Sequence, residues 1–364
     1  MKKFVLALSS ILMSMLVLPI QSLMAAENPQ VVVSIKPIHS LVSAVMEGVA
    51  TPTLLVKTGS PHAYTLRPSE ARALANADLV VWVGHELESF LEKPLQTVAK
   101  NAQKLELSEQ LKSSLLATRN SGEWQHEDHE EHKDHDEHHE EGTEEHSGHD
   151  EHHEEGIEEH KDHDEHHEEG IEEHSDNDEH HEDGAESHHE HHHGAMDLHL
   201  WLDPKIAQKI VIETTNMLVE LDPAHALQYQ SNAMKLNERL TSLDQQLKQT
   251  LKPVKATPYL VFHSAYQYFE TAYDLNAIGS VTIDPDRKPG AKGISEIRKK
   301  VKDSGARCVF SEPQFQSSLV TTIIEGTGAK TGVLDPLGSE IPEGPEAYFT
   351  LINNLANNLV IGLK

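Results

Sequence analysis

Most of the histidine in this chain lies in one acidic segment. Between His126 and His193 the sequence places 22 of its 28 histidines, together with 31 aspartates or glutamates and only two lysines. Like charges at this density repel one another, and almost nothing apolar is available for burial, so the segment cannot form part of a core. We expect it to be disordered without metal. The fold must therefore be built by the residues on either side of it.

The acidic segment, His126–His193, is made of a short repeat. Four copies of fourteen residues begin at Lys133, Ser147, Lys161 and Ser175. Neutral imidazole is the commonest nitrogen ligand of zinc and related divalent ions, and carboxylates add oxygen ligands and negative charge. The composition therefore indicates a surface that collects metal ions.

The acidic segment also accounts for the charge of the chain. Its side chains carry a formal charge of −29 out of −30 for the whole sequence, which leaves −1 for all other residues. Outside it there is no basic surplus of the kind that binds nucleic acid, so we expect no nucleic-acid partner. The remaining residues, roughly 300, are enough for two lobes that each have a core.

The first residues have the pattern of a secretory signal peptide. Lys2 and Lys3 precede an apolar stretch from Phe4 to Ile20, and two alanines that follow are small enough for a cleavage site. We expect the signal peptide to comprise residues 1–26 and to be removed on export. An uncleaved anchor is the alternative, although serines and a proline interrupt a stretch already short for a membrane span. The predicted destination is an oxidising compartment outside the cytoplasm.

Short apolar runs alternate with helical patterns outside the acidic segment. Continuous apolar runs of this length are typical of parallel strands that are buried on both faces. Strands are expected at Val31–Ile35, Thr53–Val56, Leu79–Gly84, Tyr259–Phe262, Cys308–Ser311 and Thr331–Leu334. This order of strands and helices predicts an α/β fold with two lobes of mostly parallel sheet.

A long helical pattern separates the two groups of strands. It follows a helix expected from Pro204 to Glu220, begins near Pro223 with Asp222 as its cap, and runs to about Leu251. Such a helix suits a rigid strut between lobes. The predicted organisation is a signal peptide (1–26), a first lobe (27–221) that includes a disordered loop rich in His, Asp and Glu (123–194), a linking helix (222–252) and a second lobe (253–364).

Four candidate metal ligands occupy comparable places in this plan. His62 comes shortly after the second predicted strand, and His199 comes just after the acidic segment. His263 and Asp335 each follow a strand of the second lobe. In open parallel sheets, ligands bind beyond the carboxyl ends of the strands, so a common cleft is expected. Any one of these histidines alone would more often be an ordinary hydrogen-bonded residue, but three histidines and a carboxylate together make a tetrahedral zinc set.

Five segments of the chain resemble a known family. They are GSPHAYTLRPSEARALANADLVVWVG, HLWLDP, YLVFHSAYQYFE, RCVFSEPQF and LDPLG. In this order they resemble the zinc-binding substrate-binding proteins of bacterial ABC importers, the ZnuA type. The resemblance implies a metal cleft between two lobes joined by a long helix. It also implies a periplasmic protein, expected to be a monomer, that delivers Zn²⁺ to a membrane permease with a cytoplasmic ATPase.

The resemblance also implies which residues bind the ion. His62 and His199 would come from the first lobe and His263 from the second. Manganese-binding relatives carry a carboxylate at the position of His263, so a histidine there favours zinc. Some members have a glutamate just before the first histidine, where this chain has Pro61. Asp335, a water molecule or a histidine of the acidic segment is then left to complete the coordination.

Two other functions remain possible from the sequence. A periplasmic zinc store or chaperone would use mainly the repeat. A zinc hydrolase would use three histidines with an open coordination position, but Glu312 is the only evident candidate for its general base, so we expect no enzyme activity. Cys308 is the only cysteine, where relatives often have a disulfide-bonded pair, and we interpret it as a small buried strand residue.

Overall fold

The computed structural model describes residues 28–119, 196–282, 289–315 and 318–364. The predicted signal peptide and the acidic segment lie outside these residues. Within the described ranges, no helix is both long enough and apolar enough to cross a membrane.

The first lobe is built on a parallel sheet with the strand order β2-β1-β3-β4. Its strands are β1 (Val31–Ile35), β2 (Thr53–Val56), β3 (Leu79–Trp82) and β4 (Gln103–Glu106). Its connecting helices are α1 (Lys36–Val45), α2 (Pro68–Ala75) and α3 (Glu92–Thr97). All residues of β1 and β3 are buried, which explains why these strands appear as unbroken apolar runs.

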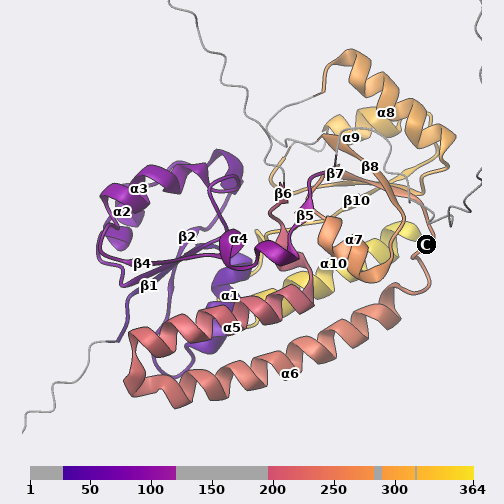
Figure 1. Cartoon of the computed structure of the whole chain (residues 1–364). Helices are drawn as coiled ribbons and strands as arrows, with labels where there is room; N and C mark the ends of the chain where they lie inside the picture. Colours follow the sequence, from indigo (N-terminus) through magenta and orange to yellow (C-terminus); the bar gives the residue numbers. More distant parts are fainter. Residues whose placement is uncertain (1–27, 120–195, 283–288, 316–317) are drawn as a thin grey trace, which may run out of the picture. The chain divides into compact units, whose positions relative to one another are not determined.

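The second lobe repeats this plan with the strand order β10-β9-β7-β8, again parallel (Figure 1). Its strands are β7 (Tyr259–His263), β8 (Ala277–Thr282), β9 (Cys308–Ser311) and β10 (Lys330–Val333). Its helices include α7 (Gln267–Tyr273), α8 (Ala291–Asp303) and α9 (Ser318–Ile324). The predicted fold of two α/β lobes is confirmed. Cys308 is fully buried, and burial raises the pKa of its thiol to about 12.

Two strands of the four-stranded sheets and the last helix of the chain are among the elements that were not expected from the sequence. In β4 only Leu105 is buried, and β8 alternates buried with half-buried residues and contains Gly279, so neither strand is a continuous apolar run. The additional helix is α10 (Ala347–Leu363) at the end of the chain. It packs on α1 of the first lobe, and Tyr348 donates its backbone N–H to Ser40 Oγ at 2.9 Å. The last helix of the second lobe therefore also belongs to the interface between the lobes.

The linking helix is present but begins differently from the prediction. Helix α5 (Pro204–Leu221) is followed by a 3-10 turn (Pro223–His225) and by α6 (Ala226–Leu251), which packs against α5, α1 and α10 (Figure 1). The prediction that Asp222 caps the helix was wrong, because its side chain makes no capping bond to the backbone. Its carboxylate instead accepts hydrogen bonds from Tyr229 Oη at 2.8 Å and His225 Nδ1 at 2.7 Å.

A short antiparallel ladder joins the described residues on either side of the acidic segment. Strand β5 (Leu116–Ala117) pairs with β6 (Met196–Asp197), and Tyr268 of α7 bridges the two strands. The Tyr268 hydroxyl accepts the N–H of Leu116 at 3.0 Å and donates to the carbonyl of Asp197 at 2.6 Å. The chain therefore leaves and re-enters the lobes at adjacent points, two residues before His199.

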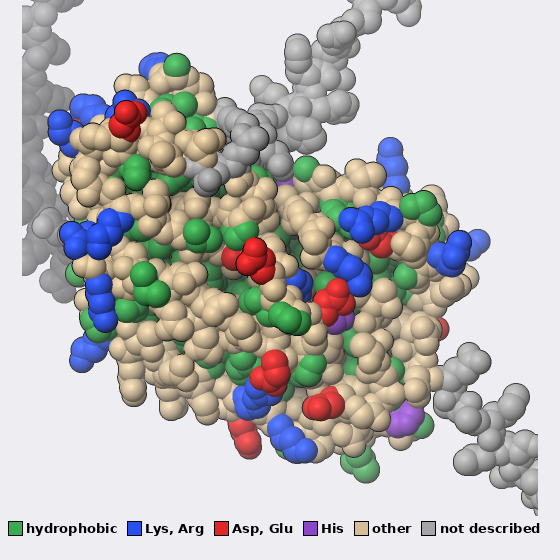
Figure 2. Space-filling view, turned by 180° about the vertical axis from the view of Figure 1, so that it is seen from behind, with side chains coloured by type: hydrophobic (Ala, Val, Ile, Leu, Met, Phe, Trp, Pro, Cys, Tyr) green, Lys and Arg blue, Asp and Glu red, His purple; other side chains and the backbone are tan. Residues whose placement is uncertain are grey.

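Charged side chains of both signs are interspersed on the face of the molecule that Figure 2 shows. This distribution agrees with the formal charge of −1 outside the acidic segment. On this face the described residues offer no extended field of one sign to a charged macromolecule.

Candidate metal site

Three histidines from distant parts of the sequence converge at one point. His62, His199 and His263 each offer one imidazole nitrogen, and these three atoms lie within 4.8 Å of one another. The Nε2 atoms of His199 and His263 are 3.4 Å apart. His199 and His263 are buried and His62 is half-buried. Across the described ranges, no other three His, Cys, Asp or Glu side chains come together in this way.

Each histidine is placed by the end of a regular element. His263 is the last residue of β7. His62 lies in a 3-10 turn (Pro61–Ala63) after β2, where Ser60 Oγ accepts the N–H of His62 at 3.2 Å. His199 comes two residues after the end of the β5–β6 ladder and starts the turn that leads into α5. The first lobe thus contributes His62 and His199, and the second lobe contributes His263. Their convergence agrees with the expectation that ligands bind beyond the carboxyl ends of parallel strands.

Two of these imidazoles are each held by a buried carboxylate, which accepts a hydrogen bond from the ring nitrogen that faces away from the other histidines. Asp197 Oδ1 accepts a hydrogen bond from His199 Nδ1 at 2.8 Å, and Glu312 Oε1 accepts one from His263 Nδ1 at 2.7 Å. Because a carboxylate accepts, each Nδ1 carries the proton and each Nε2 directs its lone pair toward the centre. Two lone pairs 3.4 Å apart repel each other unless a metal ion or a proton lies between them. The arrangement could therefore hold a metal ion.

The charge of the site matches a divalent cation. Asp197 and Glu312 are only 5% and 3% exposed, so two carboxyl groups are buried beside the imidazoles. Buried charges are costly unless they are compensated, and one M²⁺ ion would balance both. Three nitrogen ligands favour zinc over manganese or magnesium, which prefer oxygen.

The pocket at the three histidines is small. Its free volume is about 10 Å³, roughly that occupied by one water-sized sphere. Trp201, Phe315 and Leu337 give it apolar walls, which limit the access of solvent. A pocket of this size suits a single ion.

Asp335, the fourth predicted ligand, is not part of this group. It follows β10, and its carboxylate accepts hydrogen bonds from the backbone N–H groups of Leu337, Gly338 and Ser339 and from the side chain of Gln314, at 2.6 to 3.0 Å. These bonds order the loop that follows the strand. Asp335 therefore acts on the pocket through this loop, whose residue Leu337 lines it.

Comparison with known proteins agrees with this geometry. Residues 31–362 match the family model described as "ZnuA: Zinc-uptake complex component A periplasmic". The chain belongs to this family. The high-affinity zinc uptake system protein ZnuA of Brucella abortus (strain 2308) is 44% identical over 339 residues, which cover 93% of this chain and 92% of that protein. The protein of the same name from Yersinia pestis is 34% identical over 335 residues, 92% of this chain and 91% of that protein.

Solved structures share the fold of this ZnuA-family chain. A crystal structure of ZnuA superimposes with a TM-score of 0.64 at 19% identity, covering 93% of this chain and 100% of the other. A zinc-bound deletion mutant of ZnuA gives a TM-score of 0.65 at 18% identity, covering 93% of this chain and 99% of the other. At these identities the structures establish the common fold.

One residue beside the histidines was not predicted from the sequence, and the role of another was left open. Asp197 was not singled out, although it stands two residues before His199 in DLHLWL. Glu312 was considered as a general base or as a supporting residue, and its hydrogen bond to His263 gives it the supporting role. The signal in the sequence for Glu312 was its place directly after the strand Cys308–Ser311. Glu312 reaches His263 because β9 lies next to β7 in the sheet. This strand order could not be read from the sequence.

Glu312 is expected to contribute to zinc affinity without touching the ion. In Glu312→Gln the amide can donate to Nδ1, which would favour the tautomer that protonates Nε2. Loss of such a partner typically weakens metal binding by about 10- to 100-fold, and we expect an effect in this range from a titration against a competing chelator. Glu325→Gln, at an exposed position of the same lobe, is the control and should bind as the wild type does. Equal affinities for all three proteins would contradict the role assigned to Glu312.

Proposed function

We propose that this protein captures Zn²⁺ in the periplasm with His62, His199 and His263 and delivers it to the membrane permease of an ABC importer that a cytoplasmic ATPase drives. The convergence of three imidazole nitrogens within 4.8 Å carries this proposal. The names of the relatives, high-affinity zinc uptake proteins, support zinc as the cargo. Binding is reversible coordination by a monomer, with ligands from both lobes.

A water molecule is our proposal for the fourth ligand, in place of the predicted Asp335. Zinc in proteins is usually four-coordinate. Among the residues that the structure describes, no acidic or sulfur side chain joins the three histidines, and the Asp335 carboxylate accepts four hydrogen bonds within its own surroundings. A histidine of the acidic segment, which lies outside the described residues, is the other candidate.

The acidic segment is proposed to bind further zinc ions with lower affinity and to collect them for the pocket. Its composition supports this role, because 22 histidines and 31 acidic residues offer many ligands without a fixed arrangement. The ladder of β5 and β6, which joins the flanking residues, lies close to His199 in the sequence.

Binding is favoured over hydrolysis by the position of Glu312. Glu312 Oε1 already accepts the Nδ1 proton of His263, which is a supporting role for a ligand. Export by the predicted signal peptide completes the proposal, and the description of the family as periplasmic supports it.

The proposed function predicts two separable classes of zinc site. The chelated full-length protein should take up one tightly bound zinc and then several weaker ones in native mass spectrometry. Deletion of residues 127–192 should leave the tight zinc in place and remove the weaker ones, because the three histidines lie outside the deletion and the flanking strands are paired. A chelated wild-type protein without a tight site would refute the proposed function. Loss of the tight site in the deletion alone would refute the assignment of its ligands.

A further inference from the structure

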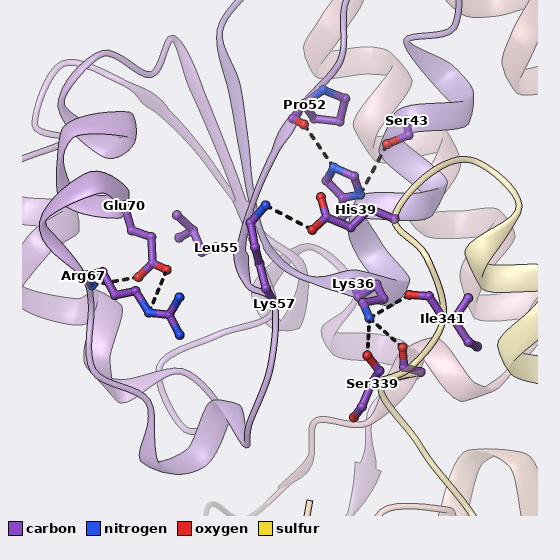
Figure 3. Close-up of polar contacts among 12 residues, drawn as sticks. Lys36, His39, Ser43, Pro52, Leu55, Lys57, Arg67, Glu70, Ser339 and Ile341 are labelled. Carbon is purple, nitrogen blue, oxygen red and sulfur yellow. Dashed lines mark hydrogen bonds and ion pairs between the residues drawn. The ribbon is translucent and has the colours of Figure 1, made fainter. Parts of the chain in front are cut away.

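A lysine of the first lobe is buried against a loop of the second. Lys36 follows β1 directly and is only 7% exposed. Its ammonium donates hydrogen bonds to the backbone carbonyls of Gly338, Ser339 and Ile341 at 2.7, 2.8 and 2.9 Å (Figure 3). An ammonium group has three N–H donors, so all of its hydrogen-bonding capacity is used on this loop.

The loop that Lys36 holds, residues 335–341, is also a wall of the zinc pocket. Pro336 and Leu337 line the pocket beside the three histidines. Trp201, two residues after His199, donates its indole N–H to the carbonyl of Pro336 at 2.8 Å. Asp335, the first residue of this loop, orders it by accepting hydrogen bonds from three of its backbone N–H groups. The first lobe therefore holds the loop at two places, one beside the pocket and one at Lys36.

The contact is stable only while the loop stays against the first lobe. Burial lowers the pKa of Lys36, while the nearby charges of Asp335 and Glu343 raise it. A buried ammonium is unfavourable unless each of its N–H groups has a partner. If the loop moved outward, the ammonium and the three carbonyls would lose their partners together. Outward motion of the loop is therefore opposed by three bonds that must break at once.

A second contact between the lobes provides a comparison (Figure 3). Lys57 pairs with Glu343 at 3.1 Å, but these side chains are 53% and 39% exposed. An exposed ion pair contributes little, because water solvates both charges equally well when the pair is broken. Lys36 and Lys57 thus come from the same lobe and meet neighbouring parts of the same chain segment, and they differ chiefly in burial.

We propose that Lys36 is a positioning residue that keeps the 335–341 loop closed over the pocket and thereby slows the release of zinc. The inference rests on the proposed function and adds to it a residue that governs how long the ion stays bound. Without Lys36, the wall formed by Pro336 and Leu337 would open more often, and the ion would leave faster. A permease that draws the lobes apart would have to break this contact to receive the ion.

Zinc dissociation measured by rapid mixing with excess chelator tests this role in the full-length protein. Lys36→Met removes the charge and the donors but keeps the length of the side chain, and the rate constant for release should rise at least about 10-fold. Lys36→Gln keeps two N–H donors and should give an intermediate rate. Lys57→Met is the matched control and should release zinc at the wild-type rate. The measurement is made well below the melting temperature of each variant, so that a loss of stability alone does not affect it.

The outcomes distinguish this inference from the proposed function. Wild-type protein that holds zinc tightly, with a folded Lys36→Met variant that releases it at the same rate, would overturn the role of Lys36 alone. An equal acceleration of zinc release by Lys57→Met would also overturn the role of Lys36, because the effect would then not depend on the burial of the lysine. If Lys36→Met does not fold, an unchanged rate in Lys36→Gln decides against the inference. Wild-type protein without tightly bound zinc would overturn both.

Discussion

Replacement of His263 by alanine is expected to weaken zinc binding in the pocket by at least about 100-fold, because even the loss of a residue that only supports a ligand costs about 10- to 100-fold. His263 is the only proposed ligand from the second lobe, and its Nε2 lies 3.4 Å from that of His199. Without His263, the ion would be bound only by His62 and His199, which both belong to the first lobe. The substitution would also leave Glu312 buried without its partner, although no ligand of the first lobe would change.

A competition titration of the full-length variant measures this effect. The weaker binding assigned to the acidic segment should persist, since those histidines are untouched. His85→Ala is a suitable control, because His85 is an exposed histidine of the first lobe outside the site. An unchanged isotherm for the tight site in His263→Ala would remove His263 from the set of ligands.

Glu88→Gln is expected to stabilise the protein above neutral pH. Glu88 lies in the turn after β3 and is completely buried. Burial raises the pKa of Glu88 to about 7 from an ordinary value of 4.5, although the hydrogen bonds that its carboxylate accepts from the N–H groups of Val83 and Gly84 lower it. The carboxyl group is thus neutral in the folded protein under conditions in which it is ionised in the unfolded chain.

The sign of the pH effect follows from this difference. Below pH 4.5 both states hold the proton of Glu88, and burial carries no ionic cost. Between pH 4.5 and 7 only the folded state holds it, so rising pH stabilises the unfolded state by ionising its carboxyl group, and the free energy of unfolding falls. Above pH 7 the loss is complete, at about 3 kcal/mol for a shift of this size.

Urea denaturation at pH 5 and pH 8 tests the prediction for Glu88. The wild type should lose stability between these two values through Glu88, whereas Glu88→Gln, which has no ionisable group there, should lack this contribution. Glu86→Gln, at an exposed neighbouring position, should follow the wild type. If the wild type and Glu88→Gln showed the same dependence on pH, the buried carboxyl would not be its source.

The strands with continuous apolar runs, and the histidines that follow them, were recognisable from the sequence. The predicted limits of β1 and β2 coincide with those in the structure, because a strand buried on both faces is recognisable from its own residues. The places of His62 and His263 after strands of parallel sheets were enough to predict a common cleft. Strands that are only partly buried, such as β4, carry no such local signal.

The partner of each buried polar side chain could be identified only from the folded arrangement of the two lobes. Glu312 reaches His263 because β9 lies next to β7, and Asp335 bonds to its own loop although its position in the sequence is that of a ligand. Lys36 and Gly338 are 302 residues apart, and nothing near either residue in the sequence indicates their contact. Burial of a side chain is governed largely by the pattern of its neighbours along the chain. The partner that it meets depends on strand order and on the packing of one lobe against the other, and these are set by all the contacts of the fold together.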